Sequence, residues 1–295
     1  STQKTRFEPG QIALLQTFAN HAAAAMQRAG LIHQLRAKIT QLEAAQVELA
    51  KKERFERELE LARQVQQSVL PRTFPQISGY QFAARNEPAR TVGGDFYDVI
   101  VLDEDHFGIA IADVSDKGMP SALYMALTRS LLHAEARRER SPRLLIENVN
   151  QLLLELGEPN MFVTVFYGVM EKASKRLTYT RSGHDRPLLA HQGTVSELGG
   201  RGVALGLFDP AHFHVTEEAI TLAAGDHLLL YTDGLTDIQS PDGSFFGKEA
   251  LKTLLQSNTD RSPDQLCEQI FAGLHQFQST ADQYDDMTML LIALD

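Results

Sequence analysis

The chain of 295 residues has no tryptophan, a single cysteine and no long apolar run. With only Cys267 an intrachain disulfide is excluded, and its place in a helically spaced apolar pattern predicts a buried structural side chain rather than a reactive thiol. No apolar stretch approaches the roughly 20 residues that span a bilayer, and the N-terminus has no signal-peptide pattern. These absences predict a protein of a reducing, cytoplasmic compartment with no membrane partner.

Basic residues are the minority among the charged residues. Lys and Arg number 28 against 38 Asp and Glu, which gives a formal net charge of -10. Because nucleic acids are bound mainly by clustered Lys and Arg, this balance argues against DNA or RNA as a partner. Hydrophobic residues make up 43% of the chain, which predicts a folded protein rather than a disordered one.

Glycine and proline are nearly absent from residues 11–69, where Ala, Gln, Glu, Leu and Arg predominate. That composition predicts one long helix, which ends before Pro71 and Pro75. Apolar residues recur in the helix in steps of three and four, the seam of a coiled coil, at Ile32, Leu35, Ile39, Leu42 and Leu49. We expect a homodimer through this seam; the alternative is a single amphipathic helix that lies along its own domain.

The rest of the chain, from about residue 79, contains short β-type runs and pairs of helical stretches. Strands are predicted at residues 108–114, 162–170, 176–180, 227–232 and 287–293. Helices are predicted at residues 120–138, 142–156, 248–256 and 263–277. Since no strict β-α-β alternation appears, we expect an α+β fold in which antiparallel or mixed sheets pack against helices.

Aspartates fall at the ends of these apolar runs, beside glycine or other small residues. They are Asp95, Asp113, Asp233, Asp285 and Asp286. A single Asp-Gly pair indicates only a turn, but several carboxylates at neighbouring strand ends cannot share a site without a cation. Oxygen ligands without a Cys or His cluster favour Mg²⁺ or Mn²⁺ over zinc. Two such ions support hydrolysis by an activated water, although the residues alone leave the substrate class open.

Four motifs occur in the order seen in bacterial metal-dependent protein phosphatases of the PPM family. They are GGDFYD at residues 93–98, DVSDKG at 113–118, YTDG at 231–234 and DDMT at 285–288. The branch that they resemble is that of the sporulation stage II E protein and the stress-response sigma-factor regulators. The likeness runs from about residue 59 to residue 295.

The resemblance implies a fold and a site. The fold is an α-β-β-α sandwich of two antiparallel sheets flanked by helices. Two metal ions would be bound by the catalytic Asp95, Asp113, Asp233 and Asp285, with the Val114 carbonyl and Asp286 as further ligands. The resemblance also implies three segments along the chain. Residues 1–30 would be the last helix of a GAF-type sensor, residues 31–70 a coiled-coil linker and switch helix, and residues 71–295 the catalytic domain. The rest of the sensor would lie upstream of residue 1.

Three residues, at positions 115, 116 and 184, bear on whether this chain follows the catalytic pattern of the family. Asp116 stands where many relatives have glycine, and Asp tolerates a left-handed backbone better than most residues. Ser115 stands where eukaryotic relatives carry a histidine that acts as a general acid, so water or another group must protonate the leaving group. His184 is a candidate replacement, but its neighbours Gly183 and Pro187 favour a structural turn.

The predicted function is that of a protein serine/threonine phosphatase controlled through its N-terminal helix. Its substrate would be phosphoserine or phosphothreonine on a regulatory partner protein, an anti-sigma-factor antagonist, attacked by a water that two metals activate. Two alternatives stay open: a non-catalytic docking module of the same fold, and a hydrolase of small phosphorylated metabolites.

Overall fold

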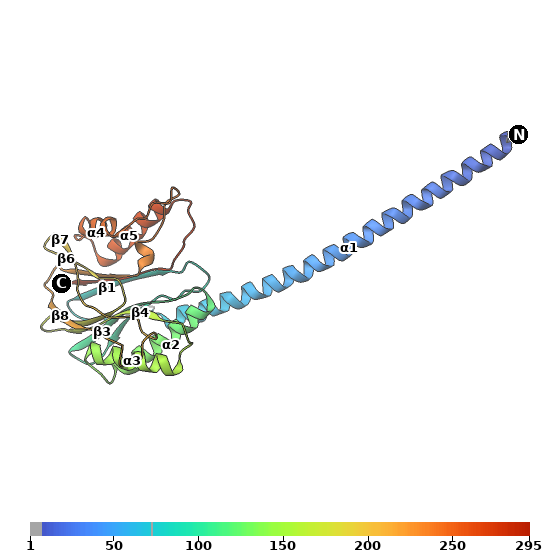
Figure 1. Ribbon diagram of the computed structural model, residues 1–295. Helices are drawn as coiled ribbons and strands as arrows, with labels where there is room; N and C mark the ends of the chain where they lie inside the picture. The colour runs from blue at the N-terminus through green and yellow to red at the C-terminus, as the bar shows by residue number, and fades with distance from the viewer. Residues whose placement is uncertain (1–7, 72) are drawn as a thin grey trace. The chain divides into compact units, whose positions relative to one another are not determined.

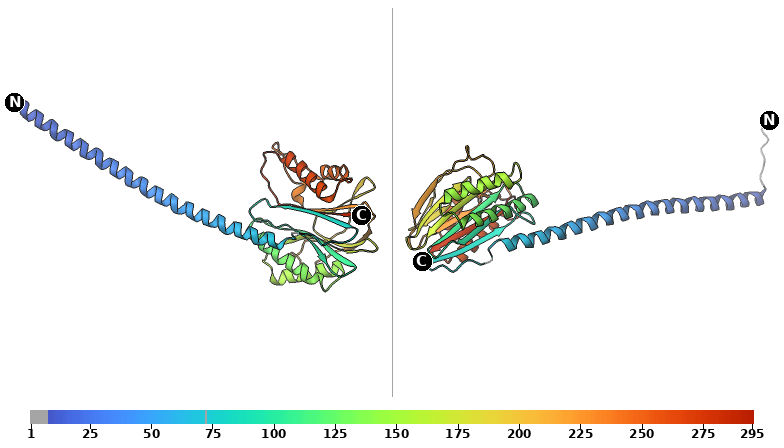
Figure 2. Two further views of the ribbon diagram at one scale, coloured as in Figure 1. Left: turned by 180° about the vertical axis from the view of Figure 1, so that it is seen from behind. Right: turned by 90° about the horizontal axis from the view of Figure 1, so that it is seen from below.

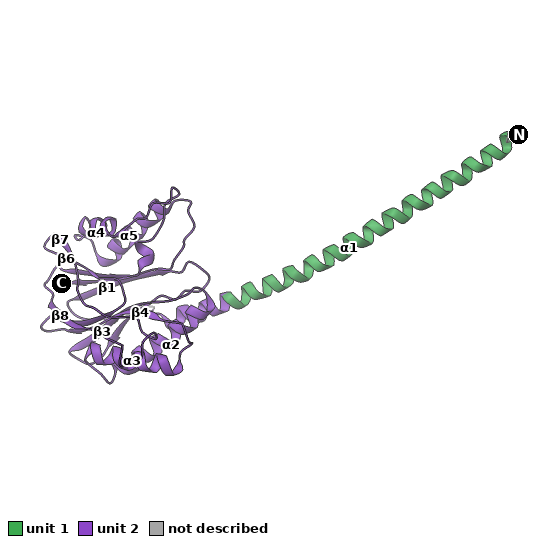
Figure 3. Ribbon diagram, in the orientation of Figure 1, with its two compact units in different colours: residues 1–59 green, residues 60–295 purple. Residues whose placement is uncertain are grey.

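The computed structural model describes residues 8–71 and 73–295 and divides into two compact units between Leu59 and Glu60 (Figure 3). The first unit is helical, and its helix α1 (Pro9–Val69) continues into the second unit. Long runs of Ala, Gln, Glu and Leu favour this helix, which begins at a proline, where the missing N–H costs nothing. No residue of α1 is buried. The sensor and linker assignments of residues 1–30 and 31–70 stay predictions.

Two five-stranded antiparallel sheets form the centre of the second unit (Figure 1). Sheet A has the strand order β1 (Tyr80–Glu87), β10 (Met287–Leu294), β9 (His227–Tyr231), β6 (Leu188–His191) and β7 (Thr194–Glu197). Sheet B has the order β2 (Phe96–Val101), β3 (His106–Val114), β4 (Val163–Glu171), β5 (Arg176–Ser182) and β8 (Glu217–Thr221).

Helix pairs cover the outer faces of both sheets, so the second unit has four layers (Figures 1 and 2). Sheet B is covered by α2 (Met119–Ala136) and α3 (Pro142–Leu156), and sheet A by α4 (Lys248–Gln256) and α5 (Pro263–Gln278). The predicted α+β sandwich of two antiparallel sheets is therefore confirmed. Cys267 is buried in the core beneath α5, where burial raises the pKa of its thiol to about 12, as expected of a structural cysteine.

The central strands are buried on both faces. In β3, Ile109 and Ile111 pack between the two sheets, while Ala110 and Ala112 face α2 and α3. Strands covered on both sides read as continuous apolar runs rather than alternating ones. Aspartates stand at one end of these strands, with Asp113 near the end of β3 and Asp286 directly before β10.

Tyr167 of β4 places a polar atom inside the core between sheet B and its helices. The side chain is fully buried, and among the described residues its hydroxyl has no hydrogen-bond partner. Gly108 makes room for it, since a Cβ at Gly108 would lie 2.9 Å from the Tyr167 hydroxyl oxygen. Burial raises the pKa of this hydroxyl well above its usual range.

Replacing Tyr167 with phenylalanine is expected to raise the free energy of unfolding by about 1 kcal/mol, because the buried hydroxyl gives up water without gaining a protein partner. Gly108→Ala should lower it by roughly 1–3 kcal/mol through overpacking against that hydroxyl. Urea denaturation of both variants and of the double variant measures the coupling. The cost of Gly108→Ala should shrink in the Tyr167→Phe background; equal costs in the two backgrounds would contradict the contact.

Candidate active site

The five predicted aspartates meet where the two sheets end side by side. Asp95 precedes β2 and Asp113 is the penultimate residue of β3, both in sheet B. Asp233 opens the 3-10 helix η1 (Asp233–Leu235) after β9, and Asp285 and Asp286 precede β10, both in sheet A. The pKa of the Asp113 carboxylate is influenced by each of the other four, so they lie close to it. The structure thus brings together residues from four separate stretches of sequence.

Burial and mutual repulsion raise the pKa values of Asp95, Asp113 and Asp233. Burial, with Asp113 and Asp286 adding repulsion, raises the pKa of Asp95 well above its usual range. Burial, with Asp233 adding repulsion, raises the pKa of Asp113 to about 7, and burial beside Asp285 raises that of Asp233 to about 6. A low-dielectric site with several like charges favours the protonated form unless a cation balances them.

Two threonines hold the Asp95 carboxylate in place. Thr232 Oγ1 donates to Asp95 Oδ2 at 2.8 Å and accepts the Thr288 N–H at 3.1 Å, and the Thr288 side chain lowers the pKa of Asp95. Asn86 in turn donates from Nδ2 to Thr288 Oγ1 at 2.7 Å. Sequence reasoning missed all three as site residues. Thr232 and Thr288 lie inside the motifs, so the pairing of β9 with β10 was the signal that could have found them.

Asp286 ties the loop before β2 to the start of β10. Its Oδ1 accepts from the Ala89 N–H and its Oδ2 from the Gly94 N–H, each at 2.7 Å. The approach is so close that a Cβ at Gly93 would lie 2.4 Å from Asp286 Oδ2. On the other side, a Cβ at Gly234 would lie 2.0 Å from the Asp286 carbonyl oxygen. Since both carboxylate oxygens accept backbone N–H groups, the structure assigns Asp286 a positioning contact, and its metal ligation stays a prediction.

The donor set fits a hard divalent cation, although it is not pre-assembled. Among the described residues, no three Asp, Glu, His or Cys side chains are arranged as a ready-made cation cage. Asp95 and Asp113 contact each other, and Asp285 Oδ2 lies 3.0 Å from Lys117 Nζ. The Val114 carbonyl faces the same region, 2.9 Å from the place of a Cβ on Gly94. Clustered oxygen donors with raised pKa values are the set that Mg²⁺ or Mn²⁺ would occupy.

His184 is placed as a structural residue rather than as a general acid. Its ring is buried, and its Nδ1 is 2.8 Å from Thr164 Oγ1. Burial lowers its pKa to about 3, so the ring is neutral near pH 7 and has no proton to give as an imidazolium. The structure therefore favours the turn interpretation of His184 over the catalytic one.

The backbone conformation of the loop after Asp113 agrees with its sequence. Asp116 adopts a left-handed backbone with φ 72°, the conformation for which many relatives have glycine. Its carboxylate accepts the N–H of Lys117 at 2.8 Å. The Ser115 hydroxyl accepts the Phe162 N–H at 2.9 Å, so Ser115 fixes the loop against the start of β4.

A four-layer sandwich with carboxylates at the adjoining ends of its two sheets defines the PP2C class of phosphatase folds. The family described as stage II sporulation protein E (SpoIIE) matches residues 103–295, more than half of the chain. The chain belongs to this SpoIIE family of PP2C-type serine/threonine phosphatases. Asp113, Asp233, Asp285 and Asp286 fall within the matched residues, whereas Asp95 precedes them.

Individual proteins show the same likeness. Protein IcfG of a Synechocystis strain is 32% identical over 263 residues, which cover 80% of this chain and 41% of IcfG. Phosphoserine phosphatase RsbU of Bacillus subtilis is 27% identical over 237 residues, 80% of this chain and 69% of RsbU. The solved SiaA-PP2C domain of Pseudomonas aeruginosa covers 83% of this chain and 98% of its own length, with a TM-score of 0.72 and 22% identity. The chain thus spans less than half the length of IcfG.

The raised carboxylate pKa values predict a pH-dependent stability in the presence of a chelator. Asp113 and Asp233 keep protons in the folded state up to about pH 7 and 6, whereas an unfolded Asp releases its proton near pH 4. The stabilisation is therefore complete below about pH 4 and is lost as the pH rises through these folded values. Between pH 5 and 8 the free energy of unfolding should fall by roughly 4 kcal/mol, measured by urea denaturation.

Excess Mn²⁺ is expected to remove most of that loss, because a divalent cation takes the place of the protons. Asp233→Asn should flatten the profile in chelator, since it removes one of the titrating groups. Stability that stays constant from pH 5 to 8 in chelator, with both proteins folded, would show that the carboxylates do not repel one another as placed.

Proposed function

We propose that this chain is a metal-dependent protein phosphatase that hydrolyses phosphoserine or phosphothreonine. The observation that carries the proposal is the convergence of five aspartates from both sheets on one buried site, with Asp113 and Asp233 at pKa values of about 7 and 6. A structural role explains a buried carboxylate that is paired with a base, but not several that repel one another. A binding module of the same fold would gain nothing from retaining this repulsion.

Each residue has a task in that proposal. Asp95, Asp113, Asp233 and Asp285, with the Val114 carbonyl, would hold two Mn²⁺ or Mg²⁺ ions, and Asp286 would add a ligand or position the loop that carries Asp95. Structures of the same fold hold two manganese ions in PstP and magnesium in RsbX. When bound, such ions lower the pKa of water and balance charge on a phosphoryl group. Thr232 would keep the Asp95 carboxylate oriented, and Thr288 would hold Thr232 through its N–H.

The substrate we propose is a phosphorylated regulatory protein, an anti-sigma-factor antagonist. RsbU, which is similar over 80% of this chain, carries the name phosphoserine phosphatase.

No helix in the described part of the chain is long and apolar enough to cross a membrane. A cytoplasmic place of action accords with the single buried cysteine. A hydrolase of small phosphorylated metabolites is the second candidate, which a substrate panel distinguishes.

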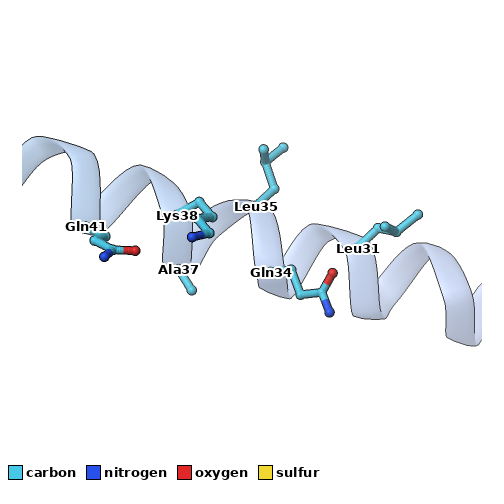
Figure 4. Close-up of a pocket in the computed structure, with 6 residues that line it drawn as sticks. All are labelled: Leu31, Gln34, Leu35, Ala37, Lys38 and Gln41. Atoms are coloured by element: carbon cyan, nitrogen blue, oxygen red, sulfur yellow. The ribbon is translucent and has the colours of Figure 1, made fainter.

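We also propose a homodimer through α1. The seam residues Ile32, Leu35, Ile39, Leu42 and Leu49 are all between 46% and 62% exposed, so the helix carries an apolar stripe that nothing covers in the single chain. Figure 4 shows Leu31 and Leu35 projecting from one side of the helix, with Gln34 and Ala37 on the other. In aqueous solution, a second helix typically covers a narrow apolar stripe of this spacing.

The end of α1 is the element through which the site would be controlled. The Gln66 side chain accepts the Gly93 N–H at 3.1 Å and donates to the Gly93 carbonyl at 2.6 Å. Gly93 adjoins Gly94 and Asp95, so a shift of the helix acts directly on the loop that positions a proposed ligand. Beside this clamp, α1 and α2 enclose an apolar crevice of about 220 Å³ lined by Ala62, Val65, Val69, Val92, Met119, Ala122, Leu123 and Ala126.

Asp233→Asn is expected to reduce Mn²⁺-dependent release of phosphate from a phosphoserine protein at least about 100-fold, because one charge that would hold the ions is lost. The native protein should be inactive in chelator and regain activity with Mn²⁺ or Mg²⁺. Asp242→Asn is the matched control, since Asp242 lies in an exposed turn and accepts from Ser240 and Ser244. Full activity of Asp233→Asn would exclude the proposed metal centre.

Gln66→Ala is expected to lower kcat/KM about tenfold without changing the oligomeric state, because two hydrogen bonds to the loop before Asp95 are lost. Deleting residues 1–55 should instead turn the dimer into a monomer, measured by light scattering, and change the activity. Gln64→Ala is the control, since that amide on the same helix bonds only to Glu60. Unchanged dimerisation and activity after the deletion would rule out control through α1.

A further inference from the structure

Lys117 bridges two loops on the solvent-exposed side of the aspartate site, which is called its mouth below. It lies between β3 and α2, and its Nζ is 3.0 Å from Asp285 Oδ2, just before β10. The same ammonium donates to the Tyr284 carbonyl and lies 3.9 Å from the centre of the Tyr284 ring. Residues from sheet B and sheet A are thus joined by one side chain at the opening between them.

This lysine is the protein's own positive charge at an acidic site. Among the described residues, Lys117 is the only basic side chain in an ion pair with any of the five clustered aspartates. A second cation stands close by, because Arg90 Nη1 lies 3.4 Å from the Lys117 carbonyl oxygen. The guanidinium is exposed, so it holds the Lys117 backbone while its charge still faces solvent. Two cations, Lys117 and Arg90, therefore stand beside the Asp116 carboxylate next to the clustered aspartates.

Lys117 can exchange its ion pair with Asp285 for an ion pair with another anion. The two side chains are 27% and 32% exposed, and an ion pair open to water is only weakly stabilising. A lysine ammonium is a mobile point charge on a flexible stem, suited to a phosphate oxygen. A phosphoserine carries a charge of about -1.5 to -2 near pH 7 and three strong acceptor oxygens, which makes it a stronger partner than one carboxylate.

We propose that Lys117 binds the phosphoryl oxygens of the substrate, with Asp285 as its partner when no substrate is present. This assignment rests on the phosphatase function proposed above. Tyr284, whose ring is 77% exposed, keeps the ammonium at the mouth through its carbonyl and its ring face. Arg90 keeps the Lys117 backbone in place. Binding therefore requires the ammonium to turn from one carboxylate toward the incoming phosphate without leaving the opening.

The test compares native protein with Lys117→Met and Lys117→Arg in three titrations. Inorganic phosphate is titrated calorimetrically into the Mn²⁺-loaded protein, a phosphoserine peptide gives KM and kcat, and Mn²⁺ alone is titrated into the metal-free protein. Lys117→Met should weaken phosphate binding and raise KM by about tenfold each, the worth of one charge-assisted hydrogen bond. Lys117→Arg should restore most of both, while Mn²⁺ binds Lys117→Met at least as tightly as native protein.

Lys252→Met is the matched control, because Lys252 is 22% exposed and pairs with Glu197 and Glu249 on a different face. It should leave all three titrations unchanged. Native phosphate affinity and KM in Lys117→Met, with tighter Mn²⁺ binding, would show that Lys117 only neutralises Asp285 and would overturn the proposal. Native protein that binds neither Mn²⁺ nor phosphate would overturn the phosphatase function itself, and this assignment with it.

Discussion

The repulsion among aspartates at one end of the sandwich is the constraint around which the rest of the domain is organised. Asp95 and Asp113 come from sheet B, and Asp233, Asp285 and Asp286 from sheet A, so the sheets must pack face to face to bring them together. The apolar core between the sheets supplies that packing through large side chains such as Ile109, Ile111, Leu230 and Leu290. The hydrophobic effect that packs the sheets therefore holds like charges closer together than their electrostatic repulsion favours.

Small residues and hydroxyls let the backbone approach the charges closely. Gly93 and Gly234 lie where any Cβ would overlap Asp286, at 2.4 and 2.0 Å from its oxygens. These glycines are required by space, since neither has a left-handed φ. Thr232 then donates to Asp95 and accepts the Thr288 N–H at 3.1 Å, which joins the ends of β9 and β10 to the site. The Asp-Gly and Gly-Gly pairs of the motifs are thus explained by packing rather than by turns alone.

The sequence predicted most of the longer strands and missed the short strands and the edge strands of sheet B. Strands β3, β4, β5, β9 and β10 were predicted, since most of them read as apolar runs. Strand β8 was missed because it is an edge strand that begins with two exposed glutamates, and β6 and β7 because they have four residues each. Strands β1 and β2 were also missed, although β2 begins inside the motif that supplied Asp95.

The aspartates of the site could be predicted from the sequence because their motifs are short and contiguous. The Gln66 and Lys117 contacts could not, because their partners lie 27 and 167 residues away and depend on tertiary packing.

A chain of hydrogen bonds joins the end of α1 to the loop that precedes Asp95. Gln66 holds both backbone groups of Gly93, Asp286 holds the next N–H at Gly94, and Asp95 follows directly. The loop is therefore fixed from two sides by bonds of 2.6 to 3.1 Å, lengths that a displacement of about 1 Å would break. Asp286 directly precedes β10 whereas Gln66 belongs to α1, so two different elements hold the two sides of this loop. Under the proposed control through α1, a change at the end of the helix would reach Asp95 through Gly93 and Gly94, without deforming the packed sheets, whose close packing resists such strain.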